Sequence, residues 1–336
     1  MTSANSNLTK LNIPFVLKPV GKDYLWGGNR LKSLYNQNLK ETPLAESWVC
    51  STHEDGISTV GSGFFKGMKL KDVLKLHPEF MGRFANLEGE IPILVKFIDS
   101  ADSLSIQVHP DDEYAGKYEN ASRGKKEMWY ILEADEDAEI ILGFRHDIEK
   151  EEVERRSKDG TILNCLNRIK VGKDRIYSVE PGTVHGIGGG IILAEIQENS
   201  NLTYRMYDYD RTDKNGRKRE LNIGKALDVI NTKSALEERQ PMRVLNYMNG
   251  RANELLYRCK YFQTERMLIN SYESGGNVIF KSLSEAFQVL LCIDGDLKIK
   301  GEEFEIAASK GTCIFVPAGD EEYELEGCAQ FLKIRA

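Results

Sequence analysis

Short apolar runs alternate with turn-forming residues along most of the chain. The runs are rich in Ile, Val, Phe and Tyr and are bounded by Gly, Asp or Pro, which is typical of β-strands. Many short strands of this kind favour an antiparallel sandwich or barrel over alternating strand–helix units. An Asp294-Gly295 pair near the C-terminus predicts the corner of a β-hairpin. The predicted strands are residues 91–98, 128–132, 139–142, 174–179, 191–196, 286–292, 297–299, 311–316 and 329–334.

Three segments, 69–84, 147–170 and 220–234, have apolar residues at helical spacing. Within the first segment Pro78 must break or restart the helix, because proline lacks the backbone N–H. In the third segment Gly224 weakens the pattern. The second segment has a strongly charged first half, followed by Ile162, Leu163, Leu166 and Ile169. These segments predict a small helical section in a mainly β protein.

Residues 176–185 and 312–321 resemble each other, since each is a strand that ends in proline and continues into a turn. The match predicts two related β-units, and weak periodicity near residue 240 predicts the boundary between them. His185 in the first unit corresponds to Glu321 in the second, so we expect a metal only in the first unit. Strand–proline turns also recur by chance in β proteins, so a coincidental match stays open here.

Length and charge narrow the classes of partner. The chain has 336 residues, enough for two domains, and its net charge is −7. A negative protein is a poor match for nucleic acid or an anionic membrane, which need a basic face. No apolar run approaches the roughly 18 residues of a membrane helix. The first residues also lack a basic region followed by an apolar core, so we expect a cytoplasmic protein with no nucleic-acid or membrane partner.

The strongest chemical signal lies at Gln107 and His109. Residues two apart on a β-strand point to the same face, so an amide oxygen and an imidazole can converge on one point. Glu127 and His185, beside other predicted strands, can bring a carboxylate and a second imidazole to it. This donor set suits a borderline divalent ion such as zinc. A hydrogen-bonded Gln–His pair without a metal is the alternative interpretation.

Several motifs occur in order along the chain: Leu-Trp-Gly-Gly at 25–28, Ala-Glu-Ser-Trp at 45–48, Gln-Val-His-Pro-Asp-Asp-Glu-Tyr-Ala at 107–115, Gly-Lys-Lys-Glu-Met-Trp-Tyr at 124–130, Pro-Gly-Thr-Val-His-Gly-Ile at 181–187 and Glu-Ile-Gln-Glu-Asn-Ser at 195–200. In these motifs the chain resembles type I mannose-6-phosphate isomerase (phosphomannose isomerase), in its short bacterial form. The resemblance implies a tandem cupin fold of two jelly-roll units. It implies a catalytic cupin domain with helical insertions at 1–240 and a C-terminal cupin-like domain without metal at 241–336.

The same resemblance implies a chemistry and a cofactor. The family interconverts mannose 6-phosphate and fructose 6-phosphate through an enediol, so a small sugar phosphate is the expected partner. It implies one Zn²⁺ ion per chain, with ligands that fall on Gln107, His109, Glu127 and His185.

The resemblance also implies functional residues around the metal. Catalytic roles fall on Glu195, Lys125 and Arg205, and we assign substrate binding to Lys96 and Trp26. A sheltered carboxylate makes Glu195 the leading base, although Lys125 stays an alternative. Either Arg205 or Lys96 can hold the phosphate. Without the family, Glu195 and Arg205 would be interpreted as an ordinary ion pair, and Trp26 as part of the core or the pocket wall.

Two other functions fit parts of the same pattern. Another metal-dependent cupin enzyme, such as an iron oxygenase, would use two histidines and one carboxylate. A tandem cupin can also bind a sugar without catalysis. The sequence leaves the choice between a monomer and a homodimer open.

Overall fold

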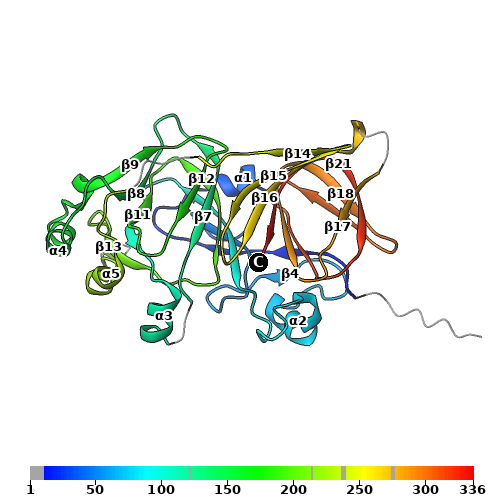
Figure 1. The fold of residues 1–336 in the computed structure, drawn as a ribbon, viewed down its shortest axis with the longest axis horizontal. Helices are drawn as coiled ribbons and strands as arrows, with labels where there is room; N and C mark the ends of the chain where they lie inside the picture. The colour runs from blue at the N-terminus through cyan, green and yellow to red at the C-terminus, as the bar shows by residue number, and fades with distance from the viewer. Residues whose placement is uncertain (1–10, 121–122, 213–214, 236–239, 274–276) are drawn as a thin grey trace, which may run out of the picture.

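The computed structural model describes residues 11–120, 123–212, 215–235, 240–273 and 277–336. In these ranges the chain forms three sheets whose neighbouring strands pair antiparallel. Two β-units lie side by side, one built mainly from the cyan and green part of the chain and one from the yellow to red part (Figure 1). The prediction of a mainly β protein with a small helical section is confirmed. No helix in these ranges is long and apolar enough to cross a membrane.

The first unit consists of a six-stranded and a five-stranded sheet. Their inward side chains form one apolar cluster that includes Trp129, Ile140, Ile187 and Leu193. The six-stranded sheet runs in the order β10 (Ile176–Val179), β7 (Glu127–Ala134), β12 (Ile191–Glu198), β5 (Ile93–Ser100), β3 (Glu46–Cys50) and β2 (Val20–Lys22). The five-stranded sheet runs in the order β13 (Tyr204–Tyr207), β6 (Ile106–Val108), β11 (His185–Ile187), β8 (Glu139–Phe144) and β9 (Leu166–Lys170).

The second unit is a ten-stranded sheet that also takes in two strands from the start of the chain. Its main order is β14 (Leu245–Met248), β15 (Arg251–Arg258), β16 (Gln263–Asn270), β21 (Glu322–Arg335), β18 (Gln288–Lys300), β20 (Cys313–Val316), β1 (Phe15–Lys18) and β4 (Thr59–Val60). Beside this path, β17 (Val278–Lys281) pairs with β21 and β19 (Glu305–Ser309) pairs with β18. Sheet membership therefore does not follow chain order, and the division at residue 240 stays a prediction. Residues 236–239, just before it, lie outside the described residues.

Short helices lie around the sheets. They are α1 (Arg30–Leu34), α2 (Leu70–Leu76), α3 (Asp112–Tyr118), α4 (Lys150–Asp159) and α5 (Ile223–Val229), with 3₁₀ turns η1 (Pro78–Met81), η2 (Ile162–Cys165) and η3 (Ser271–Glu273). As predicted, Pro78 restarts the chain in a new turn after α2. The helix predicted over 147–170 is wrong in its second half. That half forms η2 and β9, because Leu166 and Ile169 fit a strand paired with β8 as well as a helix.

The hairpin predicted at Asp294-Gly295 is also wrong. Strand β18 runs through both residues without turning back, and it pairs along its length with β21. The register shifts between Cys292 and Asp294, which marks a β-bulge. Gly295 has a φ of +73°, and a Cβ there would lie 2.2 Å from the carbonyl oxygen of Cys328. Glycine is required at this bulge and not at a chain reversal.

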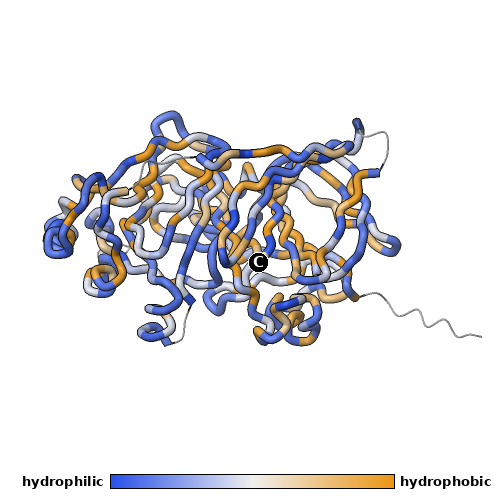
Figure 2. The backbone as a smooth tube through the Cα atoms, in the orientation of Figure 1, coloured by the Kyte–Doolittle hydropathy of each residue, from blue (hydrophilic) through white to orange (hydrophobic). Residues whose placement is uncertain are grey.

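Strand β5 contributes buried side chains to two different apolar clusters. Each of its residues is buried. Val95 and Phe97 point toward the large apolar cluster against the second unit, whereas Ile98 belongs to the core of the first unit. The apolar stretches of the tube converge in the middle of both units, and polar ones lie in the outer loops (Figure 2). Lys96 is therefore a charged residue at the centre of an apolar strand, and it faces the cavity described below.

Candidate active site

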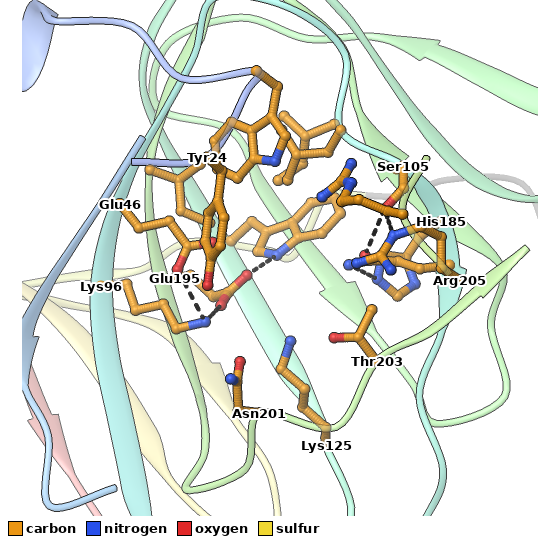
Figure 3. Close-up of a pocket in the computed structure, with 18 residues that line it drawn as sticks. Tyr24, Glu46, Lys96, Ser105, Lys125, His185, Glu195, Asn201, Thr203 and Arg205 are labelled. Carbon is orange, nitrogen blue, oxygen red and sulfur yellow. Dashed lines mark hydrogen bonds and ion pairs between the residues drawn. The ribbon is translucent and has the colours of Figure 1, made fainter. Parts of the chain in front are cut away.

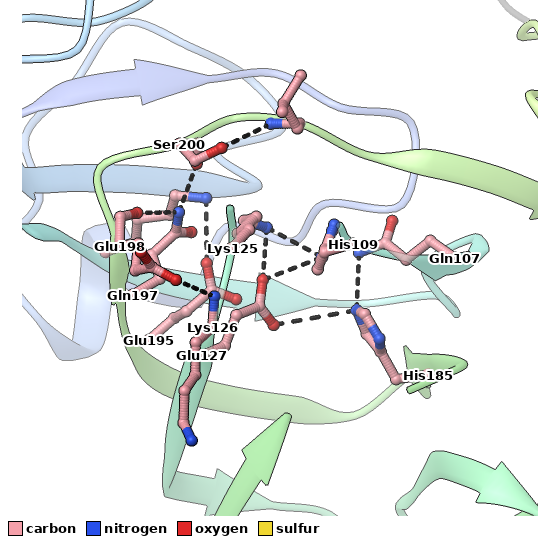
Figure 4. Close-up of polar contacts among 12 residues, drawn as sticks. Gln107, His109, Lys125, Lys126, Glu127, His185, Glu195, Gln197, Glu198 and Ser200 are labelled. Carbon is pink, nitrogen blue, oxygen red and sulfur yellow. Dashed lines mark hydrogen bonds and ion pairs between the residues drawn. The ribbon is translucent and has the colours of Figure 1, made fainter. Parts of the chain in front are cut away.

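Three side chains of metal-ligating type meet inside the first unit. His109 directly follows β6, Glu127 begins β7 and His185 begins β11. One ligand atom from each lies within 4.8 Å of the others, and all three residues are buried. Figure 4 shows the three side chains converging from these strands. The group could hold a metal ion.

Gln107 lies beside this group on strand β6. It is directly opposite His185 on one neighbouring strand and Arg205 on the other. Its amide nitrogen lies 3.3 Å from His185 Nε2. Because a half-turn of the amide exchanges its nitrogen and oxygen, Gln107 can also present an oxygen to that point. The structure thus places Gln107 beside His185, and its role as a metal ligand stays a prediction.

The protonation states of the group suit a cation. Burial lowers the pKa of His109 to about 3, with Lys125 adding to the effect, and burial also lowers the pKa of His185. Burial opposes the charge of Glu127, but Lys125 and His109 hold its pKa well below the ordinary value. His185 Nδ1 donates to the Thr183 carbonyl oxygen over 2.8 Å, so in the neutral ring Nε2 carries no proton and presents its lone pair to the group. Two neutral imidazoles and a carboxylate result.

The ammonium of Lys125 lies against the same atoms. It is 2.5 Å from Glu127 Oε1 and 3.2 Å from His109 Nε2. The Lys125 backbone N–H donates to the Pro110 carbonyl oxygen over 3.0 Å, which fixes the lysine next to the end of β6. The donor atoms that face this cation are those that a metal ion would use, so the residues present fit a bound divalent ion.

A second buried cluster lies across the cavity and centres on Glu195. Strands β5 and β12 place Glu195 opposite Lys96, whose Nζ is 3.1 Å from Glu195 Oε1 and 3.7 Å from Glu46 Oε2. Trp129 Nε1 donates to Glu195 Oε2 over 3.1 Å. Burial and the nearby charge of Glu127 raise the pKa of Glu195. Burial opposes the charge of Lys96, but Glu195 and Glu46 hold its pKa above the ordinary value.

Both clusters open into one cavity of about 270 Å³. Figure 3 shows Lys96, Glu46 and Glu195 on one side of it and Ser105, His185 and Arg205 on the other. His109 and Glu127 are not among the residues that line the cavity. Of the nine residues predicted from the sequence, seven line the cavity: Trp26, Lys96, Gln107, Lys125, His185, Glu195 and Arg205.

Arg205 makes contacts that differ from the ion pair that its spacing to Glu195 suggests. Glu195 pairs with Lys96 instead. Arg205 Nε donates to Ser105 Oγ over 3.2 Å, and Nη1 donates to the Glu220 carbonyl oxygen over 3.0 Å. Burial and the neighbouring Arg219 lower its pKa. Its guanidinium is therefore held at the cavity wall by neutral partners.

Sequence reasoning gave no role to several residues that line the cavity. Glu46 lies within one of the recognised motifs, and this was the available signal for it. The others are small or polar residues in loops, or belong to charged runs that resemble solvent-exposed turns. They are Tyr24, Ser105, Asn201, Thr203 and Arg219.

Comparison with known proteins agrees with this geometry. Residues 15–142 match the family model "Phosphomannose isomerase type I, catalytic domain", and residues 255–335 match "Mannose-6-phosphate isomerase, cupin domain". The chain is 35% identical to mannose-6-phosphate isomerase ManA of Bacillus subtilis over 94% of its own length and 97% of the relative's. It is 39% identical to the mannose-6-phosphate isomerase of Streptococcus mutans over 65% of its length and 67% of the relative's.

Solved structures show the same likeness. The crystal structure of the mannose 6-phosphate isomerase from Bacillus subtilis superposes with a TM-score of 0.87 at 32% identity, over 96% of this chain and 99% of that one. The cupin fold expected from the motifs is thus confirmed. With near-complete coverage in sequence and in structure, the chain belongs to the type I mannose-6-phosphate isomerase family of isomerases.

Proposed function

We propose that this protein interconverts mannose 6-phosphate and fructose 6-phosphate through an enediol, with one zinc ion per chain. The observation that carries the proposal is the pairing of two clusters across one cavity. One is a metal-ligating group of two neutral imidazoles and a carboxylate, and the other is a buried carboxyl group whose pKa is raised.

His109, Glu127 and His185 would hold the metal, with Gln107 as the fourth ligand. Two imidazole nitrogens and two oxygens form a donor set that suits zinc. The ion would supply a Lewis acid for the substrate oxygens, which is worth most in a site shielded from water.

Glu195 is the proposed base. In the open-chain aldose its carboxylate takes the proton from C2, a double bond forms between C1 and C2, and the carbonyl oxygen at C1 gains a proton from the ammonium of Lys125. The carboxyl group then returns its proton to C1, while the hydroxyl at C2 gives its proton back to Lys125 and becomes the ketone. A raised pKa suits this role, because the group must both accept and return a proton near neutral pH.

The cations of the cavity support these steps. Lys96 contacts Glu195 directly, and its charge opposes the rise in the pKa of Glu195, which favours the carboxylate form that a base needs. Lys125 can donate to a sugar hydroxyl or deliver a proton, since its ammonium lies at the cavity wall. Arg205 can stabilise negative charge on the substrate oxygens through its planar fork. Trp26 forms part of the wall that shapes the sugar site.

A coupled assay tests the proposal. The purified protein loaded with zinc should convert mannose 6-phosphate into fructose 6-phosphate, which glucose-6-phosphate isomerase and a dehydrogenase then report as NADPH. Lack of turnover by the zinc-loaded protein would contradict the proposal and favour a sugar-binding role. Oxygen consumption with bound iron would favour a cupin oxygenase instead. The cytoplasmic location and the choice between monomer and homodimer stay predictions.

A further inference from the structure

The backbone beside Lys125 is held against the start of helix α3. The Lys125 N–H donates to the Pro110 carbonyl oxygen over 3.0 Å, and the Gly124 N–H donates to Asp112 Oδ1, also over 3.0 Å. A Cβ at position 124 would lie 2.5 Å from the backbone carbonyl carbon of Asp111, so glycine is required for this close approach. The two bonds therefore fix the main chain of Lys125 relative to the residues that follow β6.

Tyr261 of the second unit holds Asp112 from the other side. The Tyr261 hydroxyl donates to Asp112 Oδ2 over 2.7 Å, while Oδ1 accepts from Gly124. Burial opposes the charge of Asp112, but the bonds from Tyr261 and Gly124 hold its pKa below the ordinary value. Both bonds are thus made to a carboxylate, which makes them stronger than bonds between neutral groups. Lys260 Nζ approaches Oδ2 only to 3.9 Å from a side chain that is 80% exposed, so it adds little.

The position of Tyr261 is set by the packing of its own hairpin. Tyr261 lies in the connection between β15 and β16, where the Cys259 N–H donates to the Phe262 carbonyl oxygen over 3.0 Å. Phe262 is buried in the large apolar cluster that contains residues of both units, and Tyr261 packs against the same cluster. The second unit thus supplies, from a packed position, the hydroxyl that reaches α3.

The contacts that begin at Tyr261 end at the ammonium of Lys125. Figure 4 shows this side chain pointing toward His109 and Glu127. Lys125 also lines the cavity, where the proposed function has it exchange a proton with the substrate oxygens. Because a misplacement of about 1 Å can lower a rate by about 10²-fold, the position of its backbone matters for this step.

We propose that Tyr261 and Asp112 are positioning residues through which the second unit holds Lys125 in place for catalysis. The Tyr261 hydroxyl orients the Asp112 carboxylate, and this carboxylate fixes the N–H of Gly124, the residue next to Lys125. The inference rests on the proposed function for the role of Lys125 in proton transfer. It gives the second unit a part in catalysis although, among the described residues, none from 240 onward lines the cavity.

The test combines kinetics of the zinc-loaded full chain with hydrogen exchange of its backbone amides. Asp112→Ala should lower kcat by about 10- to 100-fold, with little change in KM or metal content, because a displaced lysine transfers its proton more slowly. It should also speed exchange of the Gly124 amide, which loses its acceptor. Tyr261→Phe removes only the hydroxyl and should lower kcat by about 3- to 10-fold. Asp112→Asn should lose less activity than Asp112→Ala, because its amide oxygen can still accept from Gly124.

Two control variants separate positioning from a general loss of stability. Glu113→Ala removes the neighbouring acidic residue from the same first turn of α3, where Glu113 is exposed. Tyr323→Phe removes a hydroxyl that contacts Ser282 in the second unit and does not line the cavity. Both variants should keep the unaltered kcat and the unaltered exchange rate of the Gly124 amide.

Unchanged kcat in both Asp112→Ala and Tyr261→Phe would overturn the inference, even if amide exchange becomes faster, because the contacts would then be structural only. A fall in kcat without faster exchange at Gly124 would also overturn it, since the loss would not pass through the backbone beside Lys125. In either case, turnover by the unaltered chain would still support the proposed function. Faster exchange in the variants of a protein that does not turn over mannose 6-phosphate would support the link from Tyr261 to Gly124 and overturn the isomerase proposal.

Discussion

The two β-units use their interiors in different ways. In the second unit the sheet closes over apolar side chains such as Phe280, Leu290 and Phe331. In the first unit the space between the sheets includes buried charged groups, such as Lys96 and Glu195. Apolar packing stabilises the fold without further conditions, whereas buried charges are costly unless each finds a counter-charge or a metal. The first unit therefore accepts this cost where the candidate site lies, whereas the cluster at the centre of the second unit is apolar.

The largest effect is expected from removing a proposed metal ligand from the first unit. His185→Ala should lose the bound metal and the isomerase activity together, because Nε2 of this buried ring faces the metal-ligating group. Metal analysis by mass spectrometry and the coupled assay measure the two losses. His146→Ala is the control, since His146 is exposed, and it should retain both metal and activity. Full metal content in His185→Ala would refute the assignment of this ligand.

The next largest effect is expected from removing the proposed base while the metal-ligating group stays intact. Glu195→Gln keeps the shape of the side chain but removes the group that we propose takes the proton, so kcat should fall by about 10²- to 10⁴-fold while the metal content stays unchanged. Parallel metal analysis distinguishes this result from damage to the metal group. A kcat within a few-fold of the unaltered enzyme would transfer the role of base to another residue, with Lys125 the first alternative.

A cavity created by mutation in the second unit tests whether the packing of this unit stabilises the fold without affecting catalysis. Phe331 is fully buried in the apolar cluster of that unit, and Phe331→Ala should lower the free energy of unfolding by about 3–5 kcal/mol. At a temperature where the variant stays folded, kcat should stay near that of the unaltered enzyme. Tyr272→Ala, at a position that is 76% exposed, is the control and should change stability by less than about 0.5 kcal/mol. Denaturant unfolding and the coupled assay give the two measurements.

The smallest effect concerns a carboxyl group at the end of β12. Burial raises the pKa of Glu198 to about 8, the charge of Asp112 adds to this, and a hydrogen bond from the Lys126 N–H opposes it. Because the folded state holds this proton more tightly than the unfolded state, the contribution of Glu198 to stability falls as pH rises from about 4.5 to about 8. Glu198→Gln should remove that slope, which urea unfolding at several pH values measures. An unchanged slope in the variant would assign the pH dependence to other groups.

Much of the fold followed from local pattern, and the errors have physical causes. The strands at 91–98 and 191–196 were predicted because unbroken apolar runs bounded by turns fit strands that are buried on both faces. The segment 166–170 was assigned to a helix because its spacing fits either structure, and pairing with β8 decides between them. Asp294-Gly295 was assigned to a hairpin because a bulge and a turn both favour glycine.

For the candidate site, too, some residues could be predicted from the sequence and others could not. Gln107, His109, Glu127 and His185 were found from the donor types and from the family motifs, and the structure brings the two histidines and Glu127 within ligand distance of one another. Arg219 was not found. It lies in a charged run, and its side chain is oriented by a hydrogen bond to Asp208, a longer-range contact that local sequence does not reveal.

The most direct test of the account is a zinc titration of metal-free protein. Zinc should be added in steps while turnover of mannose 6-phosphate is measured. Activity should begin near zero, rise in proportion to the zinc added and level off at about one ion per chain, since the described part of the chain contains one group of side chains that could hold a metal. Full turnover by the metal-free protein, or binding of zinc without any gain in turnover, would contradict the account.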